Sequence, residues 1–253
     1  MLVGVDFPQL AARTGRFRHG APYAVVVGDD GARVAFLRTR GPADPAASLW
    51  ALNVATGAEL EVSPPGVESY AIDRAARTAA FAVGGRLHRA DLVTGDCTAV
   101  RTAEDVLDPR PDPTGRHIGY VTADDCLRIV GPDGADDLLA GEPGGVSWRD
   151  PGGVRWGVAD PHAREFGRTR GWWWAPDGGQ VLAARTAGSV SLHLLDLDGG
   201  WVDVHWDRET YPYVVSVRWA DFGGPLITVL RRMQQHGLVL SVDPRTGETQ
   251  VHA

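Results

Sequence analysis

Three arginines near the middle of the chain are the residues whose type and spacing point most directly to binding chemistry. Arg168, Arg170 and Arg185 lie within one short stretch, and guanidinium groups bind carboxylates and phosphates through charge-assisted hydrogen bonds. A contact with an anion at Arg168 and Arg170 is therefore one candidate site, and a charged sheet rim without a ligand is the alternative. All 25 basic residues are arginines, which excludes Schiff-base and P-loop lysine chemistry.

The residues that bind metals or form disulfides are scattered. The eight histidines form no H-x-H or H-x-x-x-H pair, and Cys97 and Cys126 are isolated, so we predict no metal site, no cofactor and no disulfide framework. The stretch from Asp196 to Gly199 resembles the start of a calcium loop, but Trp201 stands where that loop requires glycine, which favours a hairpin turn. His193 is expected to satisfy local hydrogen bonds on a strand.

Charge and the N-terminal segment limit the class of partner and the location. The formal net charge is −7, which argues against a general binder of nucleic acids or anionic membranes. The N-terminal segment has no uninterrupted apolar run followed by a cleavage-like site, so we predict no secretory signal, no transmembrane helix and a cytoplasmic protein. Arginine in place of lysine and a single asparagine suggest a bacterial source.

Turn residues and short apolar runs alternate along the chain, which contains 32 glycines and 17 prolines among its 253 residues. Each repeat has a turn, an apolar strand and a second strand that ends in Asp-x-x-Thr-Gly, its Asn variant or Asp-Gly. The closing glycines fall at residues 57, 95, 134, 199 and 247, and a spacing of about forty residues is typical of propeller blades. We predict an all-β fold, a partial β-propeller of about five blade-like repeats of four-stranded antiparallel sheet.

The fourth of these repeats looks incomplete, because Ser189 follows Gly188 directly and leaves no room for further strands. Residues 38–47 and 143–153 are rich in glycine, proline and alanine and are predicted to be loops. No shift in composition marks a hinge, so residues 1–253 are predicted to form a single domain.

The most distinctive motif runs from Glu165 to Gly178, where three tryptophans lead into a Pro-Asp-Gly turn that is typical of a β-hairpin. Further motifs are Trp156-Gly157-Val158-Ala159, Ser191-Leu192-His193-Leu194, and residues 108–115, 204–207 and 211–213. Together they resemble the N-terminal β-propeller of dipeptidyl peptidase IV-like serine peptidases, in the prolyl oligopeptidase family. The resemblance runs from Phe7 onward and implies a propeller that gates and orients peptide substrates for proteolysis.

The resemblance also implies a short helix whose two adjacent glutamates bind the α-ammonium group of the substrate. Glu165 matches the second glutamate, but Arg164 stands in place of the first. We expect Arg164 to neutralise Glu165 and to repel an ammonium group, and we expect Pro161 to disturb the helix. Glu165 and Arg164 are thus the candidate site for a substrate N-terminus, and a solvated or arginine-paired glutamate is the alternative. The tryptophans at 172–174 are expected to pack between sheets.

Members of the family carry an α/β-hydrolase domain after the propeller, with a serine nucleophile in Gly-x-Ser-x-Gly. This motif is absent here, and Ser189 after Gly188 is followed by Val190-Ser191. We therefore predict a truncated propeller with no catalytic residues of its own. Three interpretations stay open: a propeller that binds peptides or proteins, the propeller subunit of a split serine peptidase that works with a separate hydrolase domain, and a degenerate remnant. Open sheet edges further predict a homo-oligomer.

Overall fold

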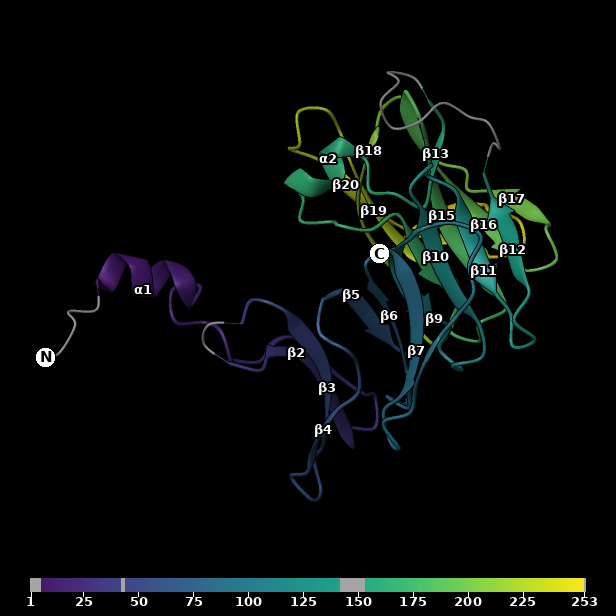
Figure 1. Ribbon diagram of the computed structural model, residues 1–253. Coiled ribbons are helices and arrows are strands. Elements are labelled where there is room, and N and C mark those ends of the chain that lie inside the picture. Colours follow the sequence, from purple (N-terminus) through teal and green to yellow (C-terminus); the bar gives the residue numbers. More distant parts are fainter. Residues whose placement is uncertain (1–5, 42–43, 142–152, 253) are drawn as a thin grey trace, which may run out of the picture. The chain divides into compact units, whose positions relative to one another are not determined.

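Short antiparallel strands make up most of the computed structural model, which describes residues 6–41, 44–141 and 153–252 (Figure 1). Two short helices are present, α1 (Phe7–Arg13) and α2 (Pro161–Glu165). The strands are β1 (Tyr23–Val27), β2 (Arg33–Thr39), β3 (Ala47–Asn53), β4 (Glu59–Glu61), β5 (Val67–Ile72), β6 (Thr78–Val83), β7 (Arg86–Asp91), β8 (Cys97–Ala99), β9 (Val106–Pro111), β10 (Ile118–Thr122), β11 (Leu127–Val130), β12 (Asp136–Ala140), β13 (Arg155–Trp156), β14 (Trp172–Trp174), β15 (Gln180–Ala187), β16 (Ser189–Asp196), β17 (Trp201–Asp203), β18 (Tyr213–Arg218), β19 (Leu226–Leu230), β20 (Gly237–Val242) and β21 (Thr249–Val251).

Consecutive strands hydrogen-bond to one another and form five sheets. Four of them have four strands in chain order: β1 to β4, β5 to β8, β9 to β12 and β18 to β21. The remaining sheet holds β13 to β17. The predicted closing glycines each lie between the last two strands of a sheet. The predicted all-β fold of about five blade-like antiparallel sheets is therefore confirmed, whereas helix α1 was not expected.

The fourth sheet is complete, so the expectation of missing strands was wrong. β13 and β14 pair with two different stretches of β15, and β16 and β17 follow on the other side. β13 has only two residues, and β17 has three with an aspartate at its end. Such short segments carry too little apolar alternation to be recognised from their sequence alone.

The closing turns explain why the repeats end in Asp-x-x-Thr-Gly. In the second sheet, Oδ1 of Asp91 accepts hydrogen bonds from the backbone N–H groups of Val93, at 2.7 Å, and Thr94, at 3.0 Å. The N–H of Gly95 donates to the carbonyl of Asp91 at 2.9 Å, and Gly95 has a φ of +83°, which glycine adopts without a steric penalty. The bonds from Thr94 and Val93 also lower the pKa of Asp91. Each turn therefore depends on an acceptor side chain and a glycine close together in sequence.

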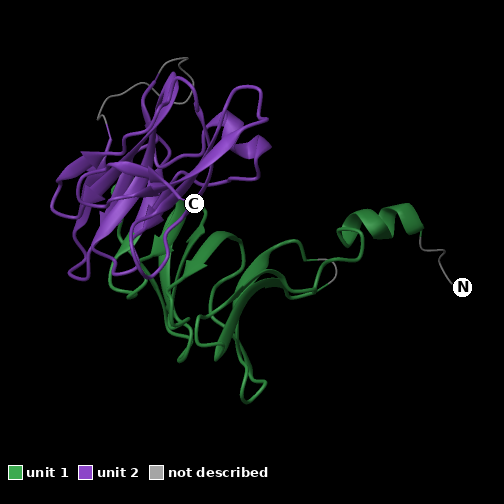
Figure 2. Ribbon diagram, turned by 180° about the vertical axis from the view of Figure 1, so that it is seen from behind, with its two compact units in different colours: residues 1–118 green, residues 119–253 purple. Residues whose placement is uncertain are grey.

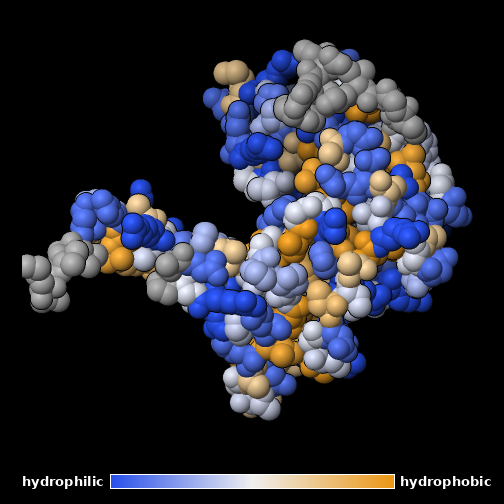
Figure 3. Space-filling view, viewed as in Figure 1, coloured by the Kyte–Doolittle hydropathy of each residue, from blue (hydrophilic) through white to orange (hydrophobic). Residues whose placement is uncertain are grey.

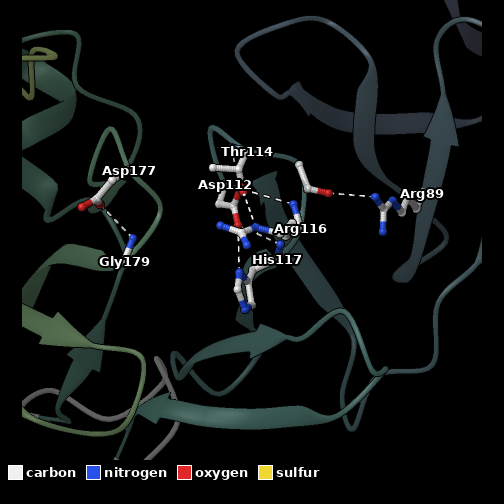
Figure 4. Close-up of polar contacts among 8 residues, drawn as sticks. Arg89, Asp112, Thr114, Arg116, His117, Asp177 and Gly179 are labelled. Carbon is white, nitrogen blue, oxygen red and sulfur yellow. Dashed lines mark hydrogen bonds and ion pairs between the residues drawn. The ribbon is translucent and has the colours of Figure 1, made fainter.

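The hairpin turns use the same chemistry at Asp112 (Figure 4). Its carboxylate accepts bonds from the N–H of Thr114 at 2.6 Å and from the N–H of His117 at 2.8 Å, and it contacts Nδ1 of His117 at 2.9 Å. Burial raises the pKa of Asp112, but the bonds from Thr114 and His117 outweigh it and leave the pKa below its ordinary value. Asp177 makes a simpler turn, with one bond from the N–H of Gly179 at 2.9 Å (Figure 4).

The chain divides into two compact units, Met1–Ile118 and Gly119–Ala253 (Figure 2). Counting only the residues described above, the first unit has one apolar core, which includes Leu49 and Phe81. On the same basis the second has two apolar clusters, one with Trp173 and the other with Trp172. Both rings are buried, as expected for residues that pack between sheets. The prediction of one domain over residues 1–253 stays a prediction.

The surface mixes polar and apolar side chains, as the face seen in Figure 3 shows. The edge strand β1 is the least covered apolar strand, since all five of its residues are exposed and Val25 and Val27 each keep 56% of their surface accessible. The predicted loop at 38–47 is shorter than expected, because β2 extends to Thr39 and β3 begins at Ala47. Most of the loop predicted at 143–153 lies outside the described residues.

Candidate functional site

Residues 157–171 leave the fourth sheet between β13 and β14 and carry helix α2. The two ends of this insertion meet at one point of β15. The N–H of Gly157 donates to the carbonyl of Ala184 at 2.9 Å, the N–H of Ala184 donates to the carbonyl of Gly171 at 2.7 Å, and the N–H of Gly171 donates to the carbonyl of Gly157 at 3.2 Å. A Cβ on Gly171 would lie 2.4 Å from the carbonyl oxygen of Val158. Only glycine therefore fits at this neck.

Helix α2 begins with a capped first turn. Asp160 is the N-cap residue, and its Oδ1 accepts a hydrogen bond from the N–H of Ala163 at 3.1 Å. Pro161 is the first helical residue, where the missing N–H has no partner within a helix and the fixed φ suits the helix. The expectation that Pro161 disturbs the helix was therefore wrong. The helix expected from the resemblance is present, and Glu165 is its last residue.

A buried ion pair within the insertion, together with a hydrogen bond from Arg168 to β18, holds the insertion in place. Nη2 of Arg168 donates a short hydrogen bond to Oδ2 of Asp160, and the two side chains are only 5% and 6% exposed. Nε and Nη1 of Arg168 donate to the carbonyls of Val214, at 3.2 Å, and Arg170, at 2.9 Å. Burial lowers the pKa of the Arg168 guanidinium, and Asp160 opposes this effect. Arg168 thus holds the insertion in place, and its contact with an external anion stays a prediction.

The three arginines that suggested an anion site do not form one cluster. The guanidinium groups of Arg168 and Arg170 each lie 5.8 Å from the ring of Trp173. Arg185 lies 6.0 Å from the ring of Trp156, which belongs to the other apolar cluster of the second unit. The structure therefore brings Arg168 and Arg170 together on one tryptophan and places Arg185 on a different one.

Glu165 and Arg164 are both exposed at the end of α2. Within the part of the chain that the structure describes, neither side chain takes part in a hydrogen bond or an ion pair. Successive residues of a helix point about 100° apart and do not face each other. No ion pair therefore joins Arg164 to Glu165 among the described residues, and the side chain of Glu165 is exposed. The expectation that Arg164 weakens the binding of an ammonium group stays a prediction.

Aromatic rings lie against helix α2 and its C-cap. The ring of Tyr213, on β18, is half-buried and lies 5.0 Å from the ring of His162 and 6.1 Å from the ring of Phe166. Nδ1 of His162 also lies 3.8 Å from Oδ1 of Asp160. Helix α2 therefore carries an exposed acidic group, and aromatic rings lie on the same helix and at its C-cap. This combination suits a cationic group attached to an apolar one.

The second unit also has a cavity of about 360 Å³, whose lining includes Asp177, Gln180, Asp196, Trp219 and Asp221. Asp196 accepts a hydrogen bond from Nε2 of Gln180 at 2.8 Å, and its carbonyl accepts one from the N–H of Gly199 at 3.1 Å, so this stretch is the hairpin turn that the sequence predicted.

Among the described residues, no three His, Cys, Asp or Glu side chains are placed to hold a metal ion. No helix in the described ranges is long and apolar enough to cross a membrane.

The role of Asp160 as the N-cap of α2 and the contact of Tyr213 with this helix were missed by reasoning from the sequence. The pair Asp160-Pro161 is a recognisable start of a helix, with a capping side chain followed by proline, and it could have placed the first turn of α2. The motif at residues 211–213 was recognised, but the contact of Tyr213 with α2 could not have been predicted, because Tyr213 lies 48 residues beyond Glu165 in the sequence and on another sheet.

Comparison with known proteins supports the fold and no finer statement. No protein-family model and no curated protein matches the sequence. Among solved structures, the dipeptidyl peptidase 4 of Porphyromonas gingivalis is similar, with a TM-score of 0.72 and 15% sequence identity over 98% of this chain. The aligned part is 41% of that protein, so this chain spans less than half of its length. The likeness establishes a propeller fold related to that of dipeptidyl peptidase 4.

Proposed function

We propose that this chain is a peptide-binding propeller module related to those of dipeptidyl peptidases, and that Glu165 receives the α-ammonium group of a peptide. One observation carries the proposal: α2 presents the open carboxylate of Glu165 on an insertion that is fixed to the sheet at both of its ends. The fold shared with dipeptidyl peptidase 4 supports the class of ligand. Orienting a peptide by its N-terminus is the role that this geometry serves.

Rigidity of the insertion is what makes a single carboxylate useful. The neck at Gly157 and Gly171, the N-cap at Asp160 and the buried Arg168 hold α2 before a ligand arrives. A ligand then does not have to pay for ordering the loop. The aromatic surface at Tyr213 would contact the first side chain of the peptide.

The expected contribution of Glu165 is modest because the group is exposed. A pair of opposite charges in solvent contributes up to about 1 kcal/mol, which corresponds to an affinity about fivefold higher for a peptide with a free N-terminus. Arg164 adds a positive charge next to Glu165 on the helix, which repels an ammonium group, so replacing Arg164 with glutamate should raise the affinity further.

Titration of the full chain with a matched pair of peptides tests this function. The peptides are Phe-Ala-Ala-Ala amide with a free N-terminus and the same peptide with an acetylated N-terminus, and binding is followed by NMR shifts. We expect the free peptide to bind about fivefold more tightly. Glu165→Gln should abolish that difference, whereas Glu209→Gln, at another exposed glutamate of the same unit, should preserve it. Equal affinities of the wild-type chain for the two peptides would refute the proposal.

A further inference from the structure

A second arrangement of reactive side chains lies on the fourth sheet, outside the α2 insertion. Ser191 and His193 are two residues apart on β16, so they share one face of the strand. His193 is directly opposite Asp203 of β17. Oγ of Ser191 lies 2.8 Å from Nε2 of His193, and Nδ1 of His193 lies 2.7 Å from Oδ1 of Asp203. The hydroxyl, the imidazole and the carboxylate form one continuous hydrogen-bonded chain.

The chemistry of the three groups determines which atoms donate and which accept in these two hydrogen bonds. A carboxylate only accepts hydrogen bonds, so Nδ1 of His193 carries the proton that is donated to Asp203. Nε2 is then the acceptor for the hydroxyl of Ser191, which is the tautomer that a general base requires. Burial lowers the pKa of His193; Asp203 opposes this effect, and the charges of Arg185 and Arg208 add to it. The imidazole is therefore neutral near pH 7 and able to take a proton.

The surroundings of His193 suit a flat apolar substrate. Its ring lies 5.0 Å from the ring of Trp156 and 5.5 Å from the ring of Trp201. The ring of Trp201 also stacks on that of Trp156 at 5.5 Å, but Trp201 is 58% exposed, so part of its ring is available to an aromatic ligand. Arg185 is directly opposite Ser191 in the pairing of β15 with β16, and its guanidinium lies 6.0 Å from the ring of Trp156. A positive charge thus lies on the same face as the hydroxyl.

We propose that Ser191 is an activated nucleophile that accepts the acyl group of small aryl esters, with His193 as its base and Asp203 as the residue that positions the base. Ser191 is 9% exposed and lies three residues after the hairpin glycine Gly188, next to the exposed Ser189. A substrate would approach from the tip of this hairpin. This proposal does not depend on peptide binding at α2. Ser191 is not part of a Gly-x-Ser-x-Gly motif, and all three residues lie on strands, Ser191 and His193 on β16 and Asp203 on β17.

The reaction balances without any group beyond water. Oγ of Ser191 attacks the carbonyl carbon of the ester, and the hydroxyl proton passes to Nε2 of His193. The bond between the carbonyl carbon and the aryl oxygen breaks, and the leaving aryl oxygen takes the proton from His193. Water then gives a proton to Nε2 of His193 while its oxygen bonds to the acyl carbon. The bond between that carbon and Oγ breaks, Oγ takes the proton back from His193, and the acid leaves. The charge of Arg185 would stabilise the oxyanion that forms at each attack.

Covalent labelling of the full chain with a fluorophosphonate tests the proposal. Oγ of a reactive serine bonds to phosphorus while the P–F bond breaks, fluoride leaves, and the hydroxyl proton passes through His193 to water. We expect one adduct in the intact mass of the wild-type chain, at Ser191 by peptide mapping. Ser189→Ala, at an exposed serine of the same strand, should label like the wild type, and Ser191→Ala should not label. His193→Gln should slow labelling at least about 100-fold.

Two further measurements separate catalysis from a structural role. The labelling rate should fall as the pH drops through the pKa of His193, which lies below the ordinary value of about 6.5, and Asp203→Asn should slow labelling at every pH because it favours the wrong tautomer. The wild-type chain unfolded in urea should not label, which would show that labelling requires the folded arrangement of the three groups. Absence of labelling in the folded wild-type chain, or equal labelling of Ser191→Ala, would overturn the proposal.

Discussion

Removing the charge of Arg168 should destabilise the second unit more than any surface substitution. Arg168→Met keeps much of the length of the side chain but leaves Asp160 buried without its partner, since both groups are almost fully enclosed. Breaking a buried ion pair by removing one partner costs about 3–5 kcal/mol. The carbonyls of Val214 and Arg170 also lose the donors that Arg168 supplies, so we expect a loss in the upper part of this range.

A double-mutant cycle isolates the pair itself. Asp160→Asn removes the negative charge but retains a side-chain oxygen that can cap α2, and it leaves Arg168 as the unpaired charge. The double variant Asp160→Asn/Arg168→Met buries no unpaired charge, so it should be more stable than the sum of the two single losses predicts. The exposed pair of Arg245 with Asp243, whose side chains are 87% and 40% exposed, supplies the control: Arg245→Met should cost about 1 kcal/mol or less.

Urea unfolding followed by tryptophan fluorescence measures these changes. The signal is the sum over nine tryptophans, and Trp173 contributes to it from the region itself, because the guanidinium of Arg168 lies 5.8 Å from its ring. The expected result is a midpoint that falls strongly in Arg168→Met and recovers in part in the double variant. A loss below about 1 kcal/mol in Arg168→Met, or strictly additive losses in the cycle, would refute the view that this pair fastens the insertion.

Three other predictions concern the neck, a turn and an edge strand. Gly171→Ala should lower the urea midpoint clearly, because its Cβ would lie 2.4 Å from a backbone oxygen, whereas Gly41→Ala, which meets nothing within 4 Å, should not. The pKa of Asp112 lies below its ordinary value, so its contribution to stability is present above about pH 4 and is lost as the pH falls through the lower folded-state pKa; the stability difference between wild type and Asp112→Asn should shrink there. The wild-type chain should self-associate through β1, and Val25→Lys/Val27→Lys should shift it towards the monomer in light scattering; an unchanged mass would contradict this.

The sequence predicted those parts of the fold that depend on neighbouring residues. Asp91 and Gly95 form a closing turn through bonds within five residues of chain, so the repeat of such turns revealed the five sheets. β13 and β17 escaped notice because two or three residues show no periodicity. Pro161 was misread because its effect depends on whether it stands in the first turn or inside the helix.

The candidate sites were harder to predict, because they depend on burial and on strand register. The sequence does not show whether Arg168 is exposed or buried. Only the structure shows that its guanidinium is buried in an ion pair with Asp160. Ser191 and His193 are close in the sequence, but Asp203 joins them only through the register of β16 with β17. Glu165 was correctly placed on a short helix through the resemblance, whereas the effect of Arg164 on its binding stays a prediction.

Hydrogen–deuterium exchange tests the central claim, that the α2 insertion binds a peptide N-terminus, most directly. Exchange is measured for the full chain alone, with Phe-Ala-Ala-Ala amide, and with the acetylated form of that peptide. Both peptides are used at the concentration at which the free-amine peptide saturates the chain. We predict that the free-amine peptide slows exchange in residues 160–170, that the acetylated peptide does so much less, and that Glu165→Gln removes the difference. Equal protection by both peptides, or protection confined to other parts of the chain, would contradict the claim.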